Sequence, residues 1–317
     1  MQVIGKKMVV FAKDFAGAKS VMESVPVVFD DRFVGAHMPI SGGLCTAFER
    51  IRSVGGTAMQ LFSRNQRQWT VPELGPEVIH AFARAWGEWG AYPVFIHDSY
   101  LVNLAGPKGE KVQCSVDAFA QEVCRAHCLS VKFLVTHPGS HLGTGVVQGL
   151  QNYVANLDRA LEQSGVEDVT ILLETTAGQG TNLGSRFEEL VFVLEHSFYA
   201  HRLGICFDTC HAFAAGYDFR SARGFHKTFE RLDQLIGLDR IGCFHLNDAK
   251  LACGSHKDRH EHIGRGKIGT MGFTRILQEP MLKHIPMILE TPKGKVLEED
   301  RMNLAVLKGL ADRYVSR

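Results

Sequence analysis

The stretch FLVTHPGSHLGTGVVQGLQNYVANLDRALEQSGVEDVTILLE, residues 133–174, decides the fold class. It begins with a short apolar run rich in β-forming residues and passes through a loop that contains Pro and Gly. It then continues as a long segment of helical period and ends in a second apolar run. A strand, a helix and a second strand in this order form a βαβ unit, in which the two strands are parallel. The stretch therefore predicts an α/β domain.

The same unit recurs on both sides of this stretch. Eight apolar runs of strand character follow one another along the chain: Phe33–His37, Ala58–Phe62, Tyr92–His97, Phe133–His137, Thr170–Glu174, Leu203–Asp208, Ile241–His245 and Met287–Glu290. Helices are predicted between them, for example over Val112–Cys128 and Val147–Gln163, and a last helix is predicted over Glu298–Val315. Eight βα units within about 250 residues predict a (β/α)8 TIM barrel rather than a doubly wound sheet, which tends to have fewer strands.

We expect one catalytic barrel domain over residues 32–317 and an N-terminal extension over residues 1–31. The extension has four lysines, four acidic residues and no arginine, and its apolar run is shorter than the core of a secretory signal. This composition favours neither export nor a typical transit peptide. We therefore expect a flexible extension, with an edge strand over Val25–Phe29 as the alternative.

The overall composition is that of an ordinary globular chain. Hydrophobic residues make up 45% of the 317 residues, and no apolar run reaches the roughly 20 residues that a membrane helix needs. The net charge of +1 does not by itself predict a nucleic-acid partner, because such proteins commonly carry a strong excess of Lys and Arg. One basic stretch is nevertheless present, and it fits either a solvated loop or a contact surface. It contains Lys250, His256, Lys257, Arg259, His260, His262, Arg265 and Lys267.

The eight cysteines form no C-x-x-C pair, which argues against a zinc ribbon and against a dense disulfide framework. We interpret them as reduced thiols and expect a cytoplasmic protein, at the nucleoid or, in a eukaryote, in the nucleus. Cys124 with Cys128 and Cys206 with Cys210 have a spacing that would suit a metal on a helix, yet the second pair lies in a strand-like stretch. We expect small buried core residues instead.

Six consecutive strand candidates end in residues of metal-binding type. These residues are His97, His137, Glu174, Asp208 with His211 three residues on, His245 and Glu290. A lone His or acid at a strand end is usually a core or capping residue. In a (β/α)8 barrel, however, the C-terminal strand ends meet at one mouth, so residues far apart in sequence converge there. Asp258 and His260, after the seventh strand, form a further set with His211.

The acidic members of this group predict cations. Glu174, Asp208 and Glu290 would repel one another in a shared cavity unless cations neutralised them. Imidazole and carboxylate ligands without thiolate indicate Zn, Mn or Fe, and the high share of imidazole favours zinc, with Mn²⁺ open at one or more sites. Because a metal lowers the pKa of a bound water from about 15.7 towards about 7, such a cluster would make hydroxide abundant at neutral pH.

Taken together, the motifs resemble those of the endonuclease IV family of apurinic/apyrimidinic endonucleases (AP endonuclease family 2). The resemblance covers about Gly35 to Glu290. It rests on the ordered strings GAHMPISGGL (35–44), FSRNQRQW (62–69), HDSYLVNL (97–104), THPGSH (136–141), LLETTAGQGTNLG (172–184), FDTCHAFAAGYD (207–218), HLNDAK (245–250), GSHKDRHEHIG (254–264) and ILET (288–291). It implies cleavage of duplex DNA 5′ to an abasic site, leaving a 3′-hydroxyl and a 5′-deoxyribose phosphate, with removal of blocked 3′ ends. We expect a monomer that acts on damaged duplex DNA.

The resemblance also implies a role for individual residues. It implies three zinc ions, held by His97, His137 and Glu174; by Glu174, Asp208, His245 and Glu290; and by His211, Asp258 and His260. Glu174 would bridge two ions and Glu290 would orient the attacking hydroxide, which makes these acids the catalytic candidates. Arg67, Tyr100 and Leu101 match the side chains that enter the minor groove and the base stack. Asn65, Gln66, Asn247 and Lys250 are further candidates for DNA contact.

Two features depart from the family pattern: Arg265 stands where the family often has Glu, and residues 1–31 extend beyond the usual start. Neither removes a ligand. A sugar isomerase or epimerase is the alternative enzyme, because relatives of xylose isomerase also carry His, Asp and Glu at a barrel mouth. The third ligand set and the Arg67 and Tyr100 pair argue against it. The alternative from another class is a zinc-dependent DNA-binding protein without turnover, which a full ligand set disfavours.

Overall fold

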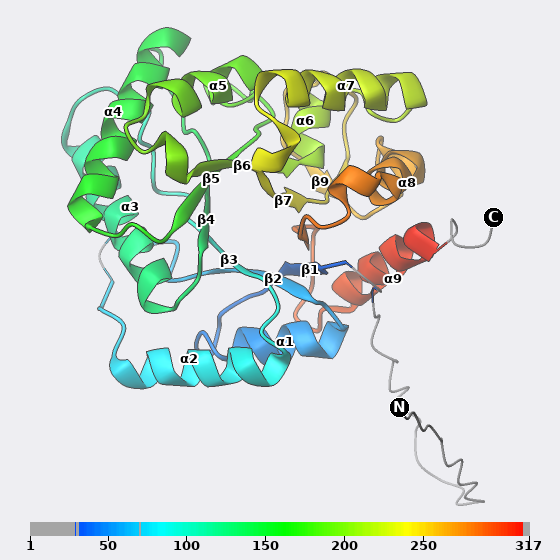
Figure 1. Cartoon of the computed structure of the whole chain (residues 1–317), viewed down its shortest axis with the longest axis horizontal. Helices are drawn as coiled ribbons and strands as arrows, with labels where there is room; N and C mark the ends of the chain where they lie inside the picture. The colour runs from blue at the N-terminus through cyan, green and yellow to red at the C-terminus, as the bar shows by residue number, and fades with distance from the viewer. Residues whose placement is uncertain (1–28, 30–31, 70, 313–317) are drawn as a thin grey trace, which may run out of the picture.

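The computed structural model describes residue 29, residues 32–69 and residues 71–312. Its centre is a closed barrel of parallel strands in the order β1-β10-β7-β6-β5-β4-β3-β2 (Figure 1). The barrel strands are β1 Val34–His37, β2 Ala58–Phe62, β3 Val94–His97, β4 Phe133–Thr136, β5 Thr170–Glu174, β6 Leu203–Asp208, β7 Ile241–His245 and β10 Met287–Leu289. The (β/α)8 barrel expected from the sequence is therefore confirmed, and each of the eight predicted runs contains one barrel strand.

Helices surround the barrel on the outside (Figure 1). They are α1 Thr46–Val54, α2 Pro76–Trp89, α3 Glu110–Cys128, α4 Val146–Ser164, α5 Phe187–His196, α6 Thr209–Ala215, α7 Ala222–Leu235, α8 Gly269–Gln278 and α9 Glu298–Asp312, with short 3-10 turns over Ala200–Arg202, Leu238–Arg240 and Pro280–Leu282. The predicted last helix is confirmed up to Asp312, and its residues 313–315 lie outside the described residues. Residues 1–28 and 30–31 also lie outside them, so the extension and most of the edge strand considered there stay predictions.

The strands alternate between two apolar environments, because successive side chains of a strand point to opposite faces. In β6, Ile205 and Phe207 face the main core shared with the helices, whereas Cys206 faces the barrel interior. That interior layer contains Ala58, Phe95, Val135, Leu172, Cys206, Cys243 and Ile288. Closure between β1 and β2 requires a glycine, since a Cβ at Gly35 would lie 1.6 Å from the Ala58 carbonyl oxygen.

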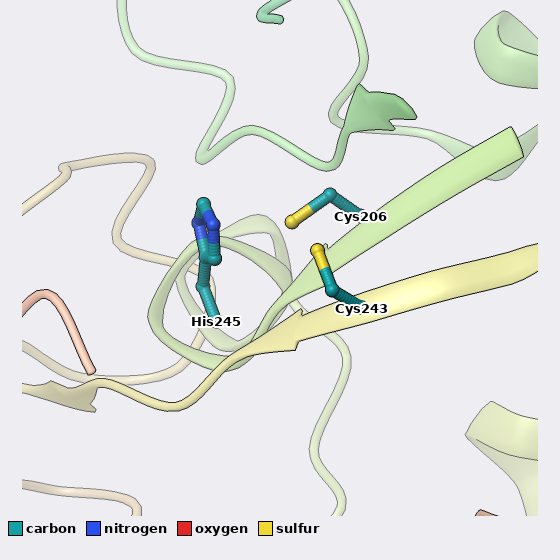
Figure 2. Close-up of side chains that lie close together, drawn as sticks. All are labelled: Cys206, Cys243 and His245. Carbon is teal, nitrogen blue, oxygen red and sulfur yellow. The ribbon is translucent and has the colours of Figure 1, made fainter. Parts of the chain in front are cut away.

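The polar site lies one layer above this apolar interior. After a register shift between Ile205 and Cys206, strand β6 pairs with β7 so that Cys206 lies opposite Cys243 and Asp208 opposite His245. Residues two apart on a strand share a face. Asp208 in β6 and His245 in β7 therefore point inward like the cysteine two residues before them. Figure 2 shows the two thiols facing each other beside the side chain of His245. A short antiparallel hairpin, β8 Asp248–Ala249 with β9 His260–Glu261, follows β7 and was not predicted.

The eight cysteines are free thiols. Cys206 and Cys210 are buried as expected and Cys124 is half-buried, but Cys128 is exposed, so the core interpretation is wrong for that residue. Cys210 lies in α6 rather than in a strand, because Asp208 ends β6 and caps the helix by accepting a hydrogen bond from the His211 N–H at 2.7 Å. Within the described residues, no helix combines the length and the apolar character needed to cross a membrane.

Candidate metal centre and nucleic-acid interface

The nine strand-end and loop residues predicted to bind metals lie together at the C-terminal mouth of the barrel. Their ligand atoms form three groups, each with its members within 4.8 Å of one another. The groups are His97, His137 and Glu174; Glu174, Asp208, His245 and Glu290; and His211, Asp258 and His260. These are the same three groups that the family resemblance implied, and Glu174 belongs to two of them.

Glu174 ends β5 and is fully buried between the first two groups. Its Oε2 lies 3.1 Å from Nε2 of His97 and 3.0 Å from Nε2 of His137. Its Oε1 lies 3.2 Å from Nδ1 of His245. One carboxylate therefore presents a different oxygen to each group, which is the arrangement that a bridging ligand needs.

The second group converges from the C-terminal ends of four strands, namely β5, β6, β7 and β10. Nδ1 of His245 lies 3.3 Å from Oε2 of Glu290 and 3.9 Å from Oδ2 of Asp208. Asn247 donates to that same Oδ2 at 2.7 Å and accepts from the Glu290 N–H at 2.8 Å. The orientation of Asp208 and the backbone of Glu290 are thus fixed by one buried amide.

The third group depends on the loop that follows β7. Nε2 of His211 lies 3.1 Å from one oxygen of Asp258, and Nε2 of His260 lies 3.1 Å from the other. The β8–β9 hairpin brings His260 to this position, where its Nδ1 donates to the Glu290 carbonyl at 3.1 Å. His211 is held from the other side, since its Nδ1 lies 2.9 Å from the Thr175 carbonyl.

Charge in the mouth is balanced between acids and imidazoles. Burial acts to lower the pKa of His211, but the carboxylates of Asp208, Asp258 and Glu174 outweigh burial and hold the pKa well above its ordinary value. For the same reason the pKa of His245 is raised to about 10 and that of His260 to about 9. Burial acts to raise the pKa of Glu174, and the surrounding histidines hold it well below its usual range. Without cations the histidines therefore carry protons as counter-charges.

These residues fit metal ions. Nε2 of His260 is buried and makes no well-aligned hydrogen bond, although Oδ1 of Asp258 lies 3.1 Å away, and a cation between the two atoms would satisfy both. Buried carboxylates and imidazoles within ligand distance of one another are the donor set that zinc and manganese accept.

Two other groups within the same distance contain thiols, namely Cys206, Cys243 and His245 (Figure 2), and Asp208, Cys210 and His260. Burial holds the pKa of Cys206 well above its ordinary value, and burial raises the pKa of Cys210 to about 12. Because the thiolate is the ligand form, these thiols are poor ligands at neutral pH. The groups of histidines and carboxylates fit a cation better.

An open cavity of about 1030 Å³ leads to the metal-ligand residues. Glu290 and His260 line it together with Arg67 and Tyr100, which lie in the loops after β2 and β3. Asn65 and Gln66 also line it. The two loops are joined, because Gln66 Oε1 accepts from the Tyr100 N–H at 3.2 Å.

The predicted DNA-contact residues differ in exposure. Tyr100 is 72% exposed, and Arg67 and Lys250 are also exposed, as a contact surface requires. Leu101 is half-buried beside Tyr100. Asn247, in contrast, is fully buried. Its amide is already occupied by Asp208 and the Glu290 backbone, so its position fits a structural role at the centre rather than direct DNA contact.

Comparison with known proteins agrees with this geometry. A family model described as xylose isomerase-like TIM barrel matches residues 48–309. The probable endonuclease 4 of Chloroflexus aurantiacus is 50% identical over 276 residues, which are 87% of this chain and 97% of that protein. The chain belongs to the endonuclease IV family. The probable endonuclease 4 of Geobacter sulfurreducens is 42% identical over 287 residues, 90% of this chain and 96% of that one.

Among solved structures, endonuclease IV from Thermus thermophilus matches with a TM-score of 0.78 and 36% identity, covering 89% of this chain and 99% of that chain. As a member of the endonuclease IV family, this chain is a phosphodiester hydrolase of the endonuclease IV type. A D-tagatose 3-epimerase-like protein matches with a TM-score of 0.68 but 19% identity, which shows a shared fold alone. This match therefore shows that sugar epimerases share the fold, but it does not support epimerase chemistry for this chain.

Sequence reasoning missed several polar residues of this endonuclease IV centre. His37 ends β1, and its Nδ1 lies 3.4 Å from Oε1 of Glu290. The strand-end pattern used for six later strands would have found it if applied to the first. Lys293 donates to the His37 carbonyl at 2.7 Å. The only sign of Gln60 in the sequence was a polar residue within the otherwise apolar run AMQLF.

Proposed function

We propose that this chain is a zinc-dependent apurinic/apyrimidinic endonuclease of base excision repair. It hydrolyses the phosphodiester 5′ to an abasic site, leaving a 3′-hydroxyl and a 5′-deoxyribose phosphate, and it also clears blocked 3′ ends. The observation that carries this proposal is the cavity that joins a three-group centre of histidines and carboxylates to an exposed Arg67 and Tyr100. A metal centre alone would fit many hydrolases, whereas the centre with this rim fits a polyanionic, kinked substrate.

Three zinc ions would be held by the three groups, with Glu174 shared between the first two. The chemistry that such ions supply when bound is activation of the attacking water and neutralisation of charge on the phosphate. The protein supplies the geometry. Glu174 fixes the spacing of two groups through its two oxygens, and Asp258 ties His211 to His260 in the third.

Glu290 is placed to act on the attacking water. It lines the cavity, and its side chain is 19% exposed, whereas Glu174 is fully buried. Its Oε1 is held by the Gln60 amide at 2.6 Å. The carboxylate can therefore orient a water molecule at the cavity floor and accept its proton, with Oε2 towards the centre.

The rim of the cavity supports recognition of damaged DNA. An exposed aromatic side chain such as Tyr100 can occupy the stack that an extruded nucleotide leaves, and Arg67 can enter the minor groove beside it. Extrusion costs least where no base is present, so an abasic nucleotide enters the cavity more easily than an intact one. Selectivity then arises from the cost of extrusion rather than from base-specific hydrogen bonds.

One cleavage assay tests this proposal. The purified protein is incubated with a duplex that carries a single abasic analogue, labelled at either end, and the products are mapped and tested for extension by a polymerase. We expect a single cut 5′ to the analogue with an extendable 3′-hydroxyl. A duplex that is bound but never cut would support the binding protein without turnover. Interconversion of free sugars without DNA cleavage would support the isomerase, and either result would overturn the proposal.

A further inference from the structure

Gln60 lies in the middle of β2 and faces the polar layer of the barrel interior, where it is fully buried. Its strand is otherwise apolar, and a buried amide is costly unless its donor and acceptor are both satisfied. Ala58, two residues earlier on the same face of β2, belongs to the apolar layer of the barrel interior. A polar residue at this depth therefore calls for a role.

Both ends of the Gln60 amide contact the second group. Its Nε2 donates to Oε1 of Glu290 at 2.6 Å, and its Oε1 accepts from Nε2 of His245 at 2.9 Å. A carboxylate that binds a cation carries no proton, so as a metal ligand Glu290 only accepts hydrogen bonds. The amide NH2 must therefore face Glu290, which leaves the amide oxygen for His245.

This orientation decides which nitrogen of His245 carries a proton. Because the Gln60 oxygen can only accept, Nε2 of His245 must donate. Nδ1 is then the nitrogen that is free to offer a lone pair to a cation, and it is Nδ1 that lies 3.2 Å from Glu174 and 3.3 Å from Glu290. The same amide holds Oε1 of Glu290 and so leaves Oε2 for the centre.

We propose that Gln60 is a positioning residue of the centre, which fixes both the ring of His245 and the rotation of Glu290. The inference rests on the proposed metal centre and assigns to one amide the task of aligning two of its ligands. Hydrogen-bond partners of metal ligands commonly contribute a factor of about 10–100 to metal affinity, and we expect Gln60 to lie in that range.

The test compares metal affinity in two Gln60 variants. Gln60→Met keeps a similar volume but offers no hydrogen bond to either partner. Gln60→Glu keeps an acceptor for His245 and loses the donor to Glu290. The matched control is Asn156→Leu, which removes a buried amide whose Nδ2 donates to the Leu104 carbonyl at 2.8 Å, away from the centre. Each zinc-loaded protein is titrated with a chelator, and kcat and KM are measured on the abasic duplex.

For Gln60→Met we expect one zinc equivalent to be released at a chelator concentration about 10–100-fold lower than in the wild type, with the other equivalents retained. We expect kcat to fall while KM for the duplex stays within about twofold, because the DNA contacts are untouched. Gln60→Glu should retain more affinity than Gln60→Met but still lose kcat. Asn156→Leu should match the wild type in affinity and kcat even if its thermal stability is lower.

Equal chelator curves and equal kcat for the wild type and both Gln60 variants would overturn the proposal. If Gln60→Met fails to fold, Gln60→Glu decides, since unchanged kcat and affinity in that variant would also contradict the role. Failure of the proposed function is a separate result: a wild-type protein that binds no zinc, or that binds zinc without cutting abasic DNA, shows it without reference to Gln60.

Discussion

Oε2 of Glu174 lies 3.0 Å from Nε2 of His137, while the other oxygen of the same carboxylate faces the second group. Because one side chain serves two groups, Glu174→Ala should lose about two of three zinc equivalents, whereas His260→Ala should lose about one. Metal analysis of the purified proteins measures this. We expect cleavage of abasic duplex to fall below detection for Glu174→Ala.

The control for this prediction is His226→Ala, since that imidazole is 79% exposed on α7 and lies 3.5 Å from Glu230, which belongs to none of the three groups. It should keep the wild-type metal content. Full zinc and full activity in Glu174→Ala would show that the bridge is assigned to the wrong residue. A wild-type content of about one equivalent or less would contradict the three-ion centre itself.

Metal loading should release protons. Without cations, the surrounding carboxylates raise the pKa of His245 to about 10 and that of His260 to about 9, so both rings are protonated at neutral pH. A ligand nitrogen must lose its proton to bind a cation. We therefore expect more than one proton released per chain at pH 7, and zinc affinity that falls steadily as the pH drops below about 9.

Calorimetric titration of the chelated protein with zinc, in buffers of different ionisation enthalpy, measures the proton count. Heat that did not depend on the buffer would show that the ligands bind without deprotonation. That result would contradict the charge balance described for the mouth.

Arg67 and Tyr100 should act on DNA and not on metal. Tyr100→Ala should weaken abasic-duplex affinity on the order of 10-fold, because an aromatic side chain in a base stack contributes about 1–3 kcal/mol. Arg67→Ala should weaken affinity as well, and both variants should keep full zinc. Hydrolysis of a small model phosphodiester should change little. Equal losses on the duplex and on the small substrate would place these residues in the centre or in the fold.

The strand-end pattern predicted most of this site because it depends on local periodicity and on one rule of barrel topology. The predicted run Tyr92–His97 was too long at its start, since Pro93 has no N–H to donate and the strand begins at Val94. The hairpin that carries His260 was not predictable, because its strands have two residues each. Its position depends on long-range contacts that no local pattern encodes.

Asp248 is an example of a residue that makes such long-range contacts. It is fully buried, and its oxygens accept from the N–H groups of Gly264 at 2.9 Å, Gly266 at 3.0 Å and Ile268 at 2.9 Å. One carboxylate thereby shapes the loop that carries Arg265. In sequence, Asn247 and Asp248 follow a strand end, a position that is typical of exposed loop residues. Their burial follows from partners in the neighbouring strands and loops.

Glu122 should make stability depend on pH. It lies on α3, fully buried, with one oxygen 2.8 Å from Nε of Arg64 and the other 2.5 Å from the Ser63 hydroxyl. Burial raises the pKa of Glu122 from 4.5 to about 7. The folded protein therefore binds more protons than the unfolded chain between these values, so this group's contribution to stability falls as the pH rises from about 4.5 to about 7.

Glu122→Gln keeps the shape and does not titrate. The melting temperature of the variant minus that of the wild type should increase by a few degrees between pH 5 and pH 8. A change of 1 kcal/mol in stability shifts the melting temperature of a large domain by about 2–4 °C. Thermal unfolding of both proteins over this range measures the difference. Glu88→Gln, on the exposed face of α2, should follow the wild type. A constant gap between Glu122→Gln and the wild type would show that Glu122 stays ionised beside Arg64.

Salt should weaken DNA binding only moderately, because a net charge of +1 leaves few basic residues free for phosphates. The exposed candidates around the mouth are Arg67, Lys250, Lys257, Arg259 and Arg265. Each neutralised phosphate contributes a log-log slope of roughly 0.9, so we expect a slope equivalent to about four to six contacts rather than ten. Preference for abasic over intact duplex should survive added salt, since it arises from the low cost of extruding a baseless nucleotide. Affinities for both duplexes across a salt series measure the two effects together. If both fell steeply and in parallel until the preference disappeared, specificity would be electrostatic, and recognition by extrusion into the cavity would be wrong.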